Sequence, residues 1–153
     1  MKKNIVVLGL GNPLMSDEGI GGFVINKLLE KKEQFPDVDF IDAGTGGLSI
    51  LHLIADRKKA IVIDCALMDT QPGTIKKFSP DDVVSVKKLT HLSLHEADLI
   101  SILRLAEQLG QCPENVVIFG IEPETVKLGM QISSCLEEKI QAYVTLISAE
   151  LSL

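Results

Sequence analysis

The sequence predicts an α/β protein, a single-domain three-layer α/β/α sandwich built on a mainly parallel, mixed five-stranded sheet. Two observations predict this class. Short runs rich in Val and Ile alternate along the chain with segments whose apolar residues recur at helical spacing. The runs are apolar at successive positions, as in strands that helices cover on both faces. With 153 residues the chain has the length of one domain, so we expect residues 1–153 to form a single domain.

Five strands are expected. Four runs rich in Val or Ile predict buried strands near residues 4–9, 38–42, 60–64 and 115–120. A fifth run, near residues 73–78, alternates in polarity and carries lysines, which is typical of an edge strand protected by charge. This fifth strand makes the sheet mixed.

Apolar residues at helical spacing predict helices between and after the strands. The stripes comprise Ile20, Phe23, Val24 and Leu28; then Leu99, Ile102, Leu103, Ala106 and Leu109; and finally positions from Ile132 to Leu151. Ser93 with Glu96, and Ser134 with Glu137, have the spacing of capping boxes. We therefore expect the last two helices to begin beside these pairs.

Composition argues against several classes of function. The formal net charge is −6, which does not suit a nucleic-acid partner. No stretch approaches the roughly 20 apolar residues that a membrane span requires. The three cysteines are scattered without C-x-x-C spacing, which favours a reducing cytoplasm over a disulfide framework.

The opening stretch GLGNPLMSDEGIGG, residues 9–22, departs from a dinucleotide-binding loop. The fingerprint G-x-G-x-x-G requires a third glycine, and Leu14 stands in its place. Asp17 and Glu18 follow where the next helix should begin, and their charge would repel a phosphate. Asp17 is more readily explained as a helix cap or first-turn charge, whereas Glu18 suits a structural or a site role equally.

Further polar residues are expected at the same edge of the sheet, because ligands of such sheets bind outside the carboxyl ends of the strands. Asp64 closes the third strand in IVIDCA, and a buried acid without a role would be costly. The stretch THLSLHEAD adds His91 and His95 before or within the next helix, although a histidine there is commonly a surface or capping residue. Glu18, Asp64 and one imidazole could therefore converge.

Two carboxylates and an imidazole leave a coordination shell incomplete, which suits a transition metal with open positions better than a closed structural zinc site. Such a set would bind a divalent ion weakly by itself. It would bind the ion tightly where a second molecule completes the shell.

The stretch DAGTGG, residues 42–47, follows the second strand and allows two interpretations. Its glycines provide positive φ for a strand-to-helix turn, or they let an extended peptide approach the backbone closely. The sequence leaves both open.

These stretches together resemble the hydrogenase maturation endopeptidases, which trim the C-terminal tail from the large subunit of nickel-iron hydrogenases. VLGLGNPLMSDEGIG matches the family's opening with its acidic pair, DAGTGG matches its D-G-G-T-x-G loop, and IVIDCA matches its strand ending in Asp. QPGTI and FGIEPE also fit, and the similarity runs from about residue 4 to residue 150.

The resemblance implies that Glu18, Asp64 and a histidine bind nickel carried by the precursor of the large subunit, and that they act in the cleavage. The family's histidine would fall at Thr90, so His91, one residue later, is our choice and His95 is the alternative. A divalent ion would substitute for nickel in the isolated protein.

The family's glycine loop holds the precursor tail. This role carries over to Asp42, Gly44, Thr45 and Gly46.

Two other functions remain as alternatives. GLGNP also opens bacterial peptidyl-tRNA hydrolases, but that family predicts a histidine soon after the opening and a basic surface, and the nearest histidine is His52. A non-catalytic α/β module that binds a metal or nucleotide at the acidic mouth is the second alternative. It would bind without turnover.

Overall fold

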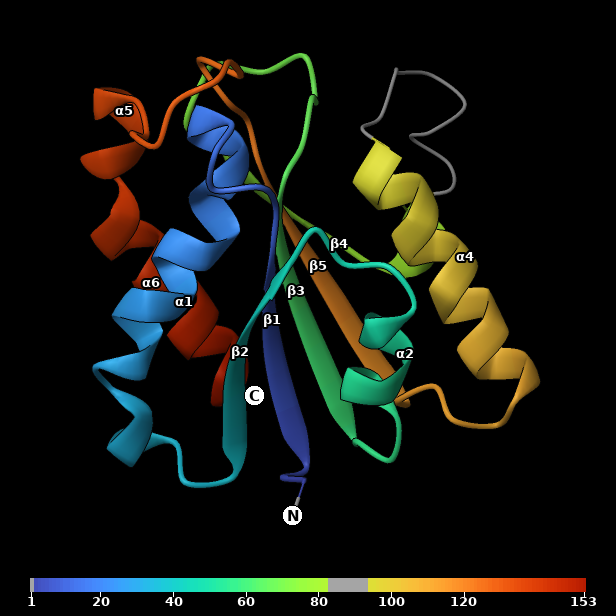
Figure 1. Ribbon diagram of the computed structural model, residues 1–153. Helices are drawn as coiled ribbons and strands as arrows, with labels where there is room; N and C mark the ends of the chain where they lie inside the picture. Colours follow the sequence, from blue (N-terminus) through green and yellow to red (C-terminus); the bar gives the residue numbers. More distant parts are fainter. Residues whose placement is uncertain (1, 83–93) are drawn as a thin grey trace.

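The computed structural model describes residues 2–82 and 94–153, with the side chains of residues 2–82 and 99–153. The described residues form a five-stranded sheet of order β2-β1-β3-β5-β4 (Figure 1). Its strands are β1 (Ile5–Leu10), β2 (Val38–Gly44), β3 (Lys59–Cys65), β4 (Ile75–Phe78) and β5 (Asn115–Ile121). Four strands are parallel, and β4 pairs antiparallel with β5 at the edge. The predicted mixed sheet and its lysine-bearing edge strand are confirmed.

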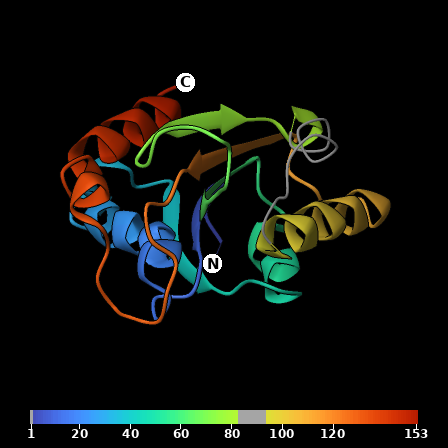
Figure 2. The ribbon, with the colours of Figure 1, turned by 90° about the horizontal axis from the view of Figure 1, so that it is seen from above.

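Helices cover both faces of the sheet, as Figure 2 shows from above. One layer holds α1 (Ile20–Leu29), the short α5 (Ser134–Glu137) and α6 (Ile140–Leu151). The other holds α2 (Ser49–Ile54) and α4 (Leu94–Gln108). Two 3-10 turns complete the described elements, η1 (Ser16–Gly19) and η2 (Lys32–Gln34). The predicted three-layer sandwich is confirmed.

The core consists of two aliphatic clusters, one on each face of the sheet, because successive strand side chains point to opposite faces. Val7 packs with α1 and α6, whereas its neighbours Val6 and Leu8 pack with α2 and α4. All three are fully buried. This double burial explains why the strands are apolar at successive positions.

Some helix details differ from the sequence prediction. Phe23 is 38% exposed and Leu109 is 54% exposed, so neither belongs to the buried stripe. The last helix is interrupted after Glu137, and its first segment has Ser133 as N-cap. The predicted capping box of Ser134 with Glu137 is wrong, because the helix begins one residue earlier and has no side-chain cap. Ser93 lies outside the described residues.

The topology places the carboxyl ends of the parallel strands at one edge of the sheet, at the top of Figure 1. The loops after β1, β2, β3 and β5 gather there, and α4 begins at the same end. Within the described residues, no helix is long and apolar enough to span a membrane.

Candidate functional site at the carboxyl edge of the sheet

The glycines of the opening stretch allow backbone segments to approach one another closely. A Cβ built on Gly9 would lie 2.4 Å from the carbonyl oxygen of Gly21, so β1 and α1 meet with no room for a side chain. Gly11 has φ +125°, and a Cβ there would lie 1.8 Å from the carbonyl oxygen of Glu18. These glycines therefore seat η1 and α1 against the end of β1. They perform a packing role, which needs no third glycine at position 14.

Glu18 and Asp64 lie on segments that the fold brings into contact. Glu18 is half-buried in η1, which packs against β3. Asp64 is the penultimate residue of β3 and only 1% exposed, and its Oδ1 accepts a hydrogen bond of 2.8 Å from the N–H of Cys65. The structure thus places both predicted acids at the carboxyl edge of the sheet.

The predicted histidine His91 lies outside the described residues. His95 falls in the first turn of α4, of which only the backbone is described. Among the described side chains, no group of three His, Cys, Asp or Glu residues is arranged to hold a metal ion. The identity of the third ligand therefore stays a prediction.

The DAGTGG stretch forms the end of β2 and the turn that leads to α2. Gly44, Gly46 and Gly47 all have positive φ, at 58°, 82° and 83°, so the turn requires residues without a Cβ. Asp42 is exposed and its Oδ1 accepts a 3.0 Å hydrogen bond from the N–H of Gly44. Apart from the neighbouring residues in the chain, no described heavy atom lies within 4 Å of a Cβ built on Gly44 or Gly47. The turn interpretation accounts for the glycines, and open space remains beside them.

This turn is attached directly to the opening stretch. The N–H of Gly11 donates a 2.7 Å hydrogen bond to the carbonyl of Gly44, across a shift in register between β1 and β2. Asp42 also lies near the start of α1, because a Cβ on Gly22 would be 2.9 Å from Oδ2 of Asp42. The loop that carries Asp42, Gly44, Thr45 and Gly46 therefore borders the segment that carries Glu18.

Asp17 lies in the first turn of η1, one of the two structural roles expected for it, but its carboxylate does not cap that turn. It is completely buried, and its carboxylate accepts four hydrogen bonds from the loop between β5 and α5. The donors are the N–H groups of Glu124 and Thr125 at 2.9 Å, and the N–H and hydroxyl of Ser133 at 2.6 Å. Burial raises the pKa of Asp17, but these hydrogen bonds outweigh it and hold the pKa below its ordinary value.

Glu122 plays a similar part for the loop that follows Asp64. Its side chain is buried, and Oε1 accepts hydrogen bonds from the N–H of Met68 at 2.7 Å and from the N–H and hydroxyl of Thr70 at 3.0 Å. The backbone of Glu122 also accepts from the N–H of Gly73 at 2.8 Å. Glu122 in FGIEPE therefore has a structural explanation, and Gly73 in QPGTI has a positive φ of 89°.

Tyr143 of α6 also binds the loop between β3 and β4. Its hydroxyl donates a 2.6 Å hydrogen bond to the carbonyl of Gly73, and burial raises the pKa of Tyr143 to about 12. The phenol therefore stays a hydrogen-bond donor at neutral pH. Sequence reasoning assigned this residue only to an apolar stripe.

The cysteines offer no activated thiolate. Cys65 is buried in the core, and burial raises the pKa of Cys112 and of Cys135. The thiol of Cys135 also donates to Oε2 of Glu124 at 3.3 Å. A raised pKa favours the protonated thiol, so these residues are poor nucleophiles at neutral pH.

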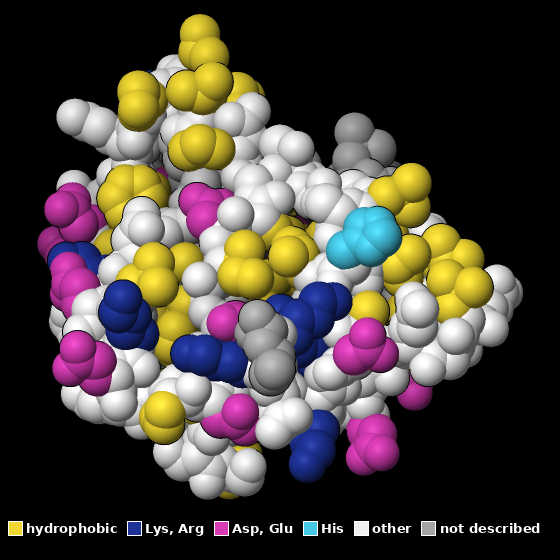
Figure 3. Space-filling model, turned by 60° about the horizontal axis from the view of Figure 1, so that its bottom comes forward, with side chains coloured by type: hydrophobic (Ala, Val, Ile, Leu, Met, Phe, Trp, Pro, Cys, Tyr) yellow, Lys and Arg dark blue, Asp and Glu magenta, His cyan; other side chains and the backbone are white. Residues whose placement is uncertain are grey.

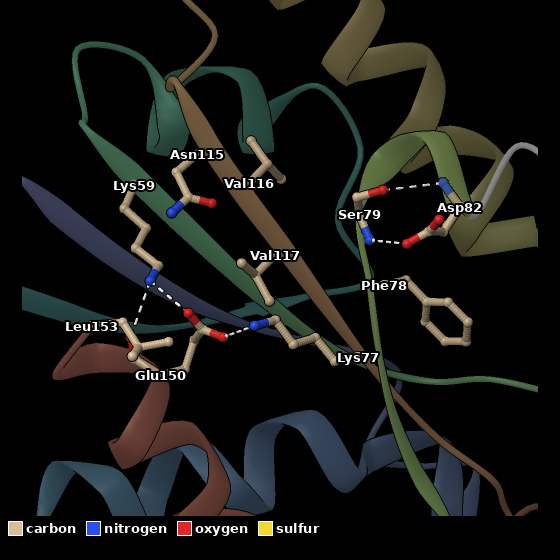
Figure 4. Close-up of a pocket in the computed structure, with 10 residues that line it drawn as sticks. All are labelled: Lys59, Lys77, Phe78, Ser79, Asp82, Asn115, Val116, Val117, Glu150 and Leu153. Carbon is tan, nitrogen blue, oxygen red and sulfur yellow. Dashed lines mark hydrogen bonds and ion pairs between the residues drawn. The ribbon is translucent and has the colours of Figure 1, made fainter.

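A second polar region lies at the opposite, amino-terminal edge, which Figure 3 turns toward the reader. A hollow of about 520 Å³ is lined there by Lys59, Lys77 and Glu150, among other residues (Figure 4). The Nζ of Lys59 lies 2.7 Å from Oε2 of Glu150, and Lys77 pairs with the other oxygen. The two lysines of this hollow are therefore ion-paired with Glu150.

The chain belongs to the hydrogenase maturation protease family, whose model matches residues 23–150. The fold described above is therefore that of a family of proteases.

Curated relatives are also hydrogenase expression/formation proteins. The chain is 31% identical over 123 residues to hydrogenase expression/formation protein HoxM of Cupriavidus necator. The matched region covers 80% of this chain and 61% of that protein. The chain thus spans about three fifths of the length of the first curated relatives that it matches.

Solved structures match over almost the whole chain. The hydrogenase maturating endopeptidase HybD of E. coli superposes with a TM-score of 0.83 and 26% identity, covering 99% of this chain and 93% of that one. A hydrogenase 2 maturation peptidase from a Thaumarchaeota archaeon has a TM-score of 0.73 and 30% identity, covering 99% of both chains.

Proposed function

We propose that the protein is an endopeptidase that removes the C-terminal extension of a nickel-iron hydrogenase large-subunit precursor after nickel insertion, and that it recognises the bound metal. Membership of the maturation protease family supports the peptidase activity. The observation that carries the site is the placement of Glu18 and Asp64 on contacting segments at the carboxyl edge of the sheet. HybD of E. coli, which shares this fold, is an endopeptidase.

In this proposal nickel is part of the substrate. Glu18, Asp64 and His91 contact the ion that the precursor already carries, and their incomplete ligand set binds tightly only when the precursor supplies the remaining ligands. The ion polarises the scissile carbonyl or activates a water, and a carboxylate assists as base. A precursor without nickel would lack the group that these residues recognise.

The loop of Asp42, Gly44, Thr45 and Gly46 holds the tail of the precursor. The open space beside Gly44 and the exposed carboxylate of Asp42 support this role, since an extended peptide can approach the backbone there. We place the reaction in the cytoplasm, which agrees with three cysteines that form no disulfide.

The test compares nickel-loaded with nickel-free precursor. Each is incubated with the protein, and the mass of the large subunit is followed over time. We expect loss of the C-terminal extension from the nickel-loaded precursor alone. Equal cleavage of both would defeat metal recognition, and binding without any mass loss would support a non-catalytic module instead.

A further inference from the structure

Asp17 joins two parts of the chain that are far apart in sequence. Its hydrogen-bond donors lie 107 to 116 positions away, and the carboxylate is completely buried. Oδ2 accepts from the N–H groups of Glu124 and Thr125 and from the hydroxyl of Ser133, while Oδ1 accepts from the N–H of Ser133. Both oxygens are therefore engaged by the protein itself.

The turn that carries Asp17 and Glu18 is held mainly from outside. η1 has only 4 residues, so it contributes little hydrogen bonding of its own. The N–H of Asp17 donates to the carbonyl of Thr125, and the N–H of Ser16 donates to the carbonyl of Gly129. The hydroxyl of Ser16 adds a 2.7 Å bond to the carbonyl of Lys127.

On its other side the same turn rests against β1. The carbonyl of Glu18 occupies the space that a side chain on Gly11 would need. Glu18 therefore follows a residue fixed by the β5–α5 loop, and its own backbone is seated on the end of a core strand. A displacement of this turn would move Glu18 relative to Asp64, which belongs to the buried central strand β3.

We infer that Asp17 is a positioning residue that sets the place of Glu18 relative to Asp64. Of the acidic pair, Asp17 holds the turn and Glu18 contacts the metal of the substrate. This inference rests on the proposed function. It assigns to Asp17 no contact with the precursor, because all its bonds point into the protein.

The test uses two buried carboxylates at opposite edges of the sheet. Asp17→Asn places an amide NH₂ where a carboxylate oxygen accepts from at least one backbone N–H, and Glu150→Gln places one beside Lys59 and Lys77. Both variants lose stability, so Glu150→Gln controls for destabilisation. Cleavage of nickel-loaded precursor is measured for both, with kcat and KM determined separately and the thermal midpoint of each recorded.

We expect kcat of Asp17→Asn to fall about 100-fold, the cost of moving a reacting group by about 1 Å. KM should rise as well, because Glu18 also contacts the substrate's metal. Glu150→Gln should keep the kcat of the wild type. Ser133→Ala removes a single donor and should lower kcat by a smaller factor. Its effect should not add to that of Asp17→Asn, because both changes break the same contact.

An unchanged kcat in Asp17→Asn would overturn the inference, and so would an equal loss in Glu150→Gln. Should Asp17→Asn not fold, a folded Ser133→Ala with the kcat of the wild type would overturn it as well. These results differ from failure of the proposed function, in which the wild type itself leaves nickel-loaded precursor intact and both proposals are overturned together.

Discussion

The two edges of the sheet both bury carboxylates, but they neutralise them differently. At the amino-terminal edge, Glu150 is paired with Lys59 and Lys77. At the carboxyl edge, Asp17 and Glu122 accept hydrogen bonds from backbone N–H and hydroxyl groups, and neither takes part in an ion pair among the described residues. At the amino-terminal edge, the negative charge of Glu150 is therefore balanced by lysines of the protein itself. The carboxyl edge keeps a negative field beside Glu18 and Asp64, which favours the approach of a metal cation.

The largest effect is expected from Asp64→Asn, which removes one charge from the carboxyl edge. Processing of nickel-loaded precursor should fall by more than about 100-fold, the upper range for loss of a residue that only supports a metal ligand. Circular dichroism should stay that of the wild type. Asp56→Asn is the matched control, because Asp56 is an exposed acid in the turn before β3, and it should process normally. Processing by Asp64→Asn at the rate of this control would contradict the site.

Lys59→Ala, at the amino-terminal edge, should lower stability and leave processing unchanged, the reverse of what is expected for Asp64→Asn. It breaks a buried ion pair and leaves Glu150 with Lys77 alone, so the free energy of unfolding should fall by about 3 kcal/mol. Urea denaturation measures this loss. The rate of precursor processing under conditions where the variant stays folded should equal that of the wild type. A loss of processing beyond the unfolded fraction would show that the two edges are not independent.

The packing role of Gly11 in the opening stretch can be tested by comparison with Gly44, which also has a positive φ. Gly11→Ala meets the carbonyl of Glu18, whereas Gly44→Ala has open space around its Cβ. Gly44→Ala should cost only the conformational strain of about 1 kcal/mol, and Gly11→Ala should cost more, about 3 kcal/mol, because η1 must move. Gly11→Ala should also slow processing. Equal unfolding free energies for the two variants would contradict the packing role of Gly11.

The smallest effect concerns acid stability. Burial raises the pKa of Glu150, but hydrogen bonds from Lys59 and Lys77 outweigh it and keep the pKa below its ordinary value. A lowered pKa in the folded state means that this stabilisation is fully present above the unfolded pKa and is lost as pH falls through the folded pKa. Urea titrations below pH 5 should show a shallower loss of stability in Glu150→Gln than in the wild type. Parallel curves would contradict the assignment.

The sequence was sufficient to predict the strands and the edge at which the acids gather. Val and Ile runs buried on both faces identify the strands, and the topology then places Glu18 and Asp64 at the carboxyl ends of neighbouring strands. The sequence did not predict the hydrogen bonds of Asp17. Its position suggested a cap or a first-turn charge, whereas its donors come from the β5–α5 loop. The capping box failed for the same reason, because the serine at the N-cap, Ser133, uses its hydroxyl on Asp17.

Long-range pairs explain the remaining misses. Lys59 and Glu150 are 91 positions apart, and Glu122 meets Thr70 across 52 positions. Each acid stands among residues of ordinary strand or helix pattern, so no periodicity marks it. Such pairs follow only from the packing of complete elements.

A crystal of the protein soaked with Cd²⁺ or Ni²⁺, with the ion located by anomalous scattering, would show whether Glu18 and Asp64 share one ion. We expect one ion at the carboxyl edge, with oxygens of both Glu18 and Asp64 at about 2.0–2.4 Å and the imidazole of His91 as the third protein ligand. An ion bound to neither acid, or carboxylates of Glu18 and Asp64 too far apart to share one ion, would contradict this expectation.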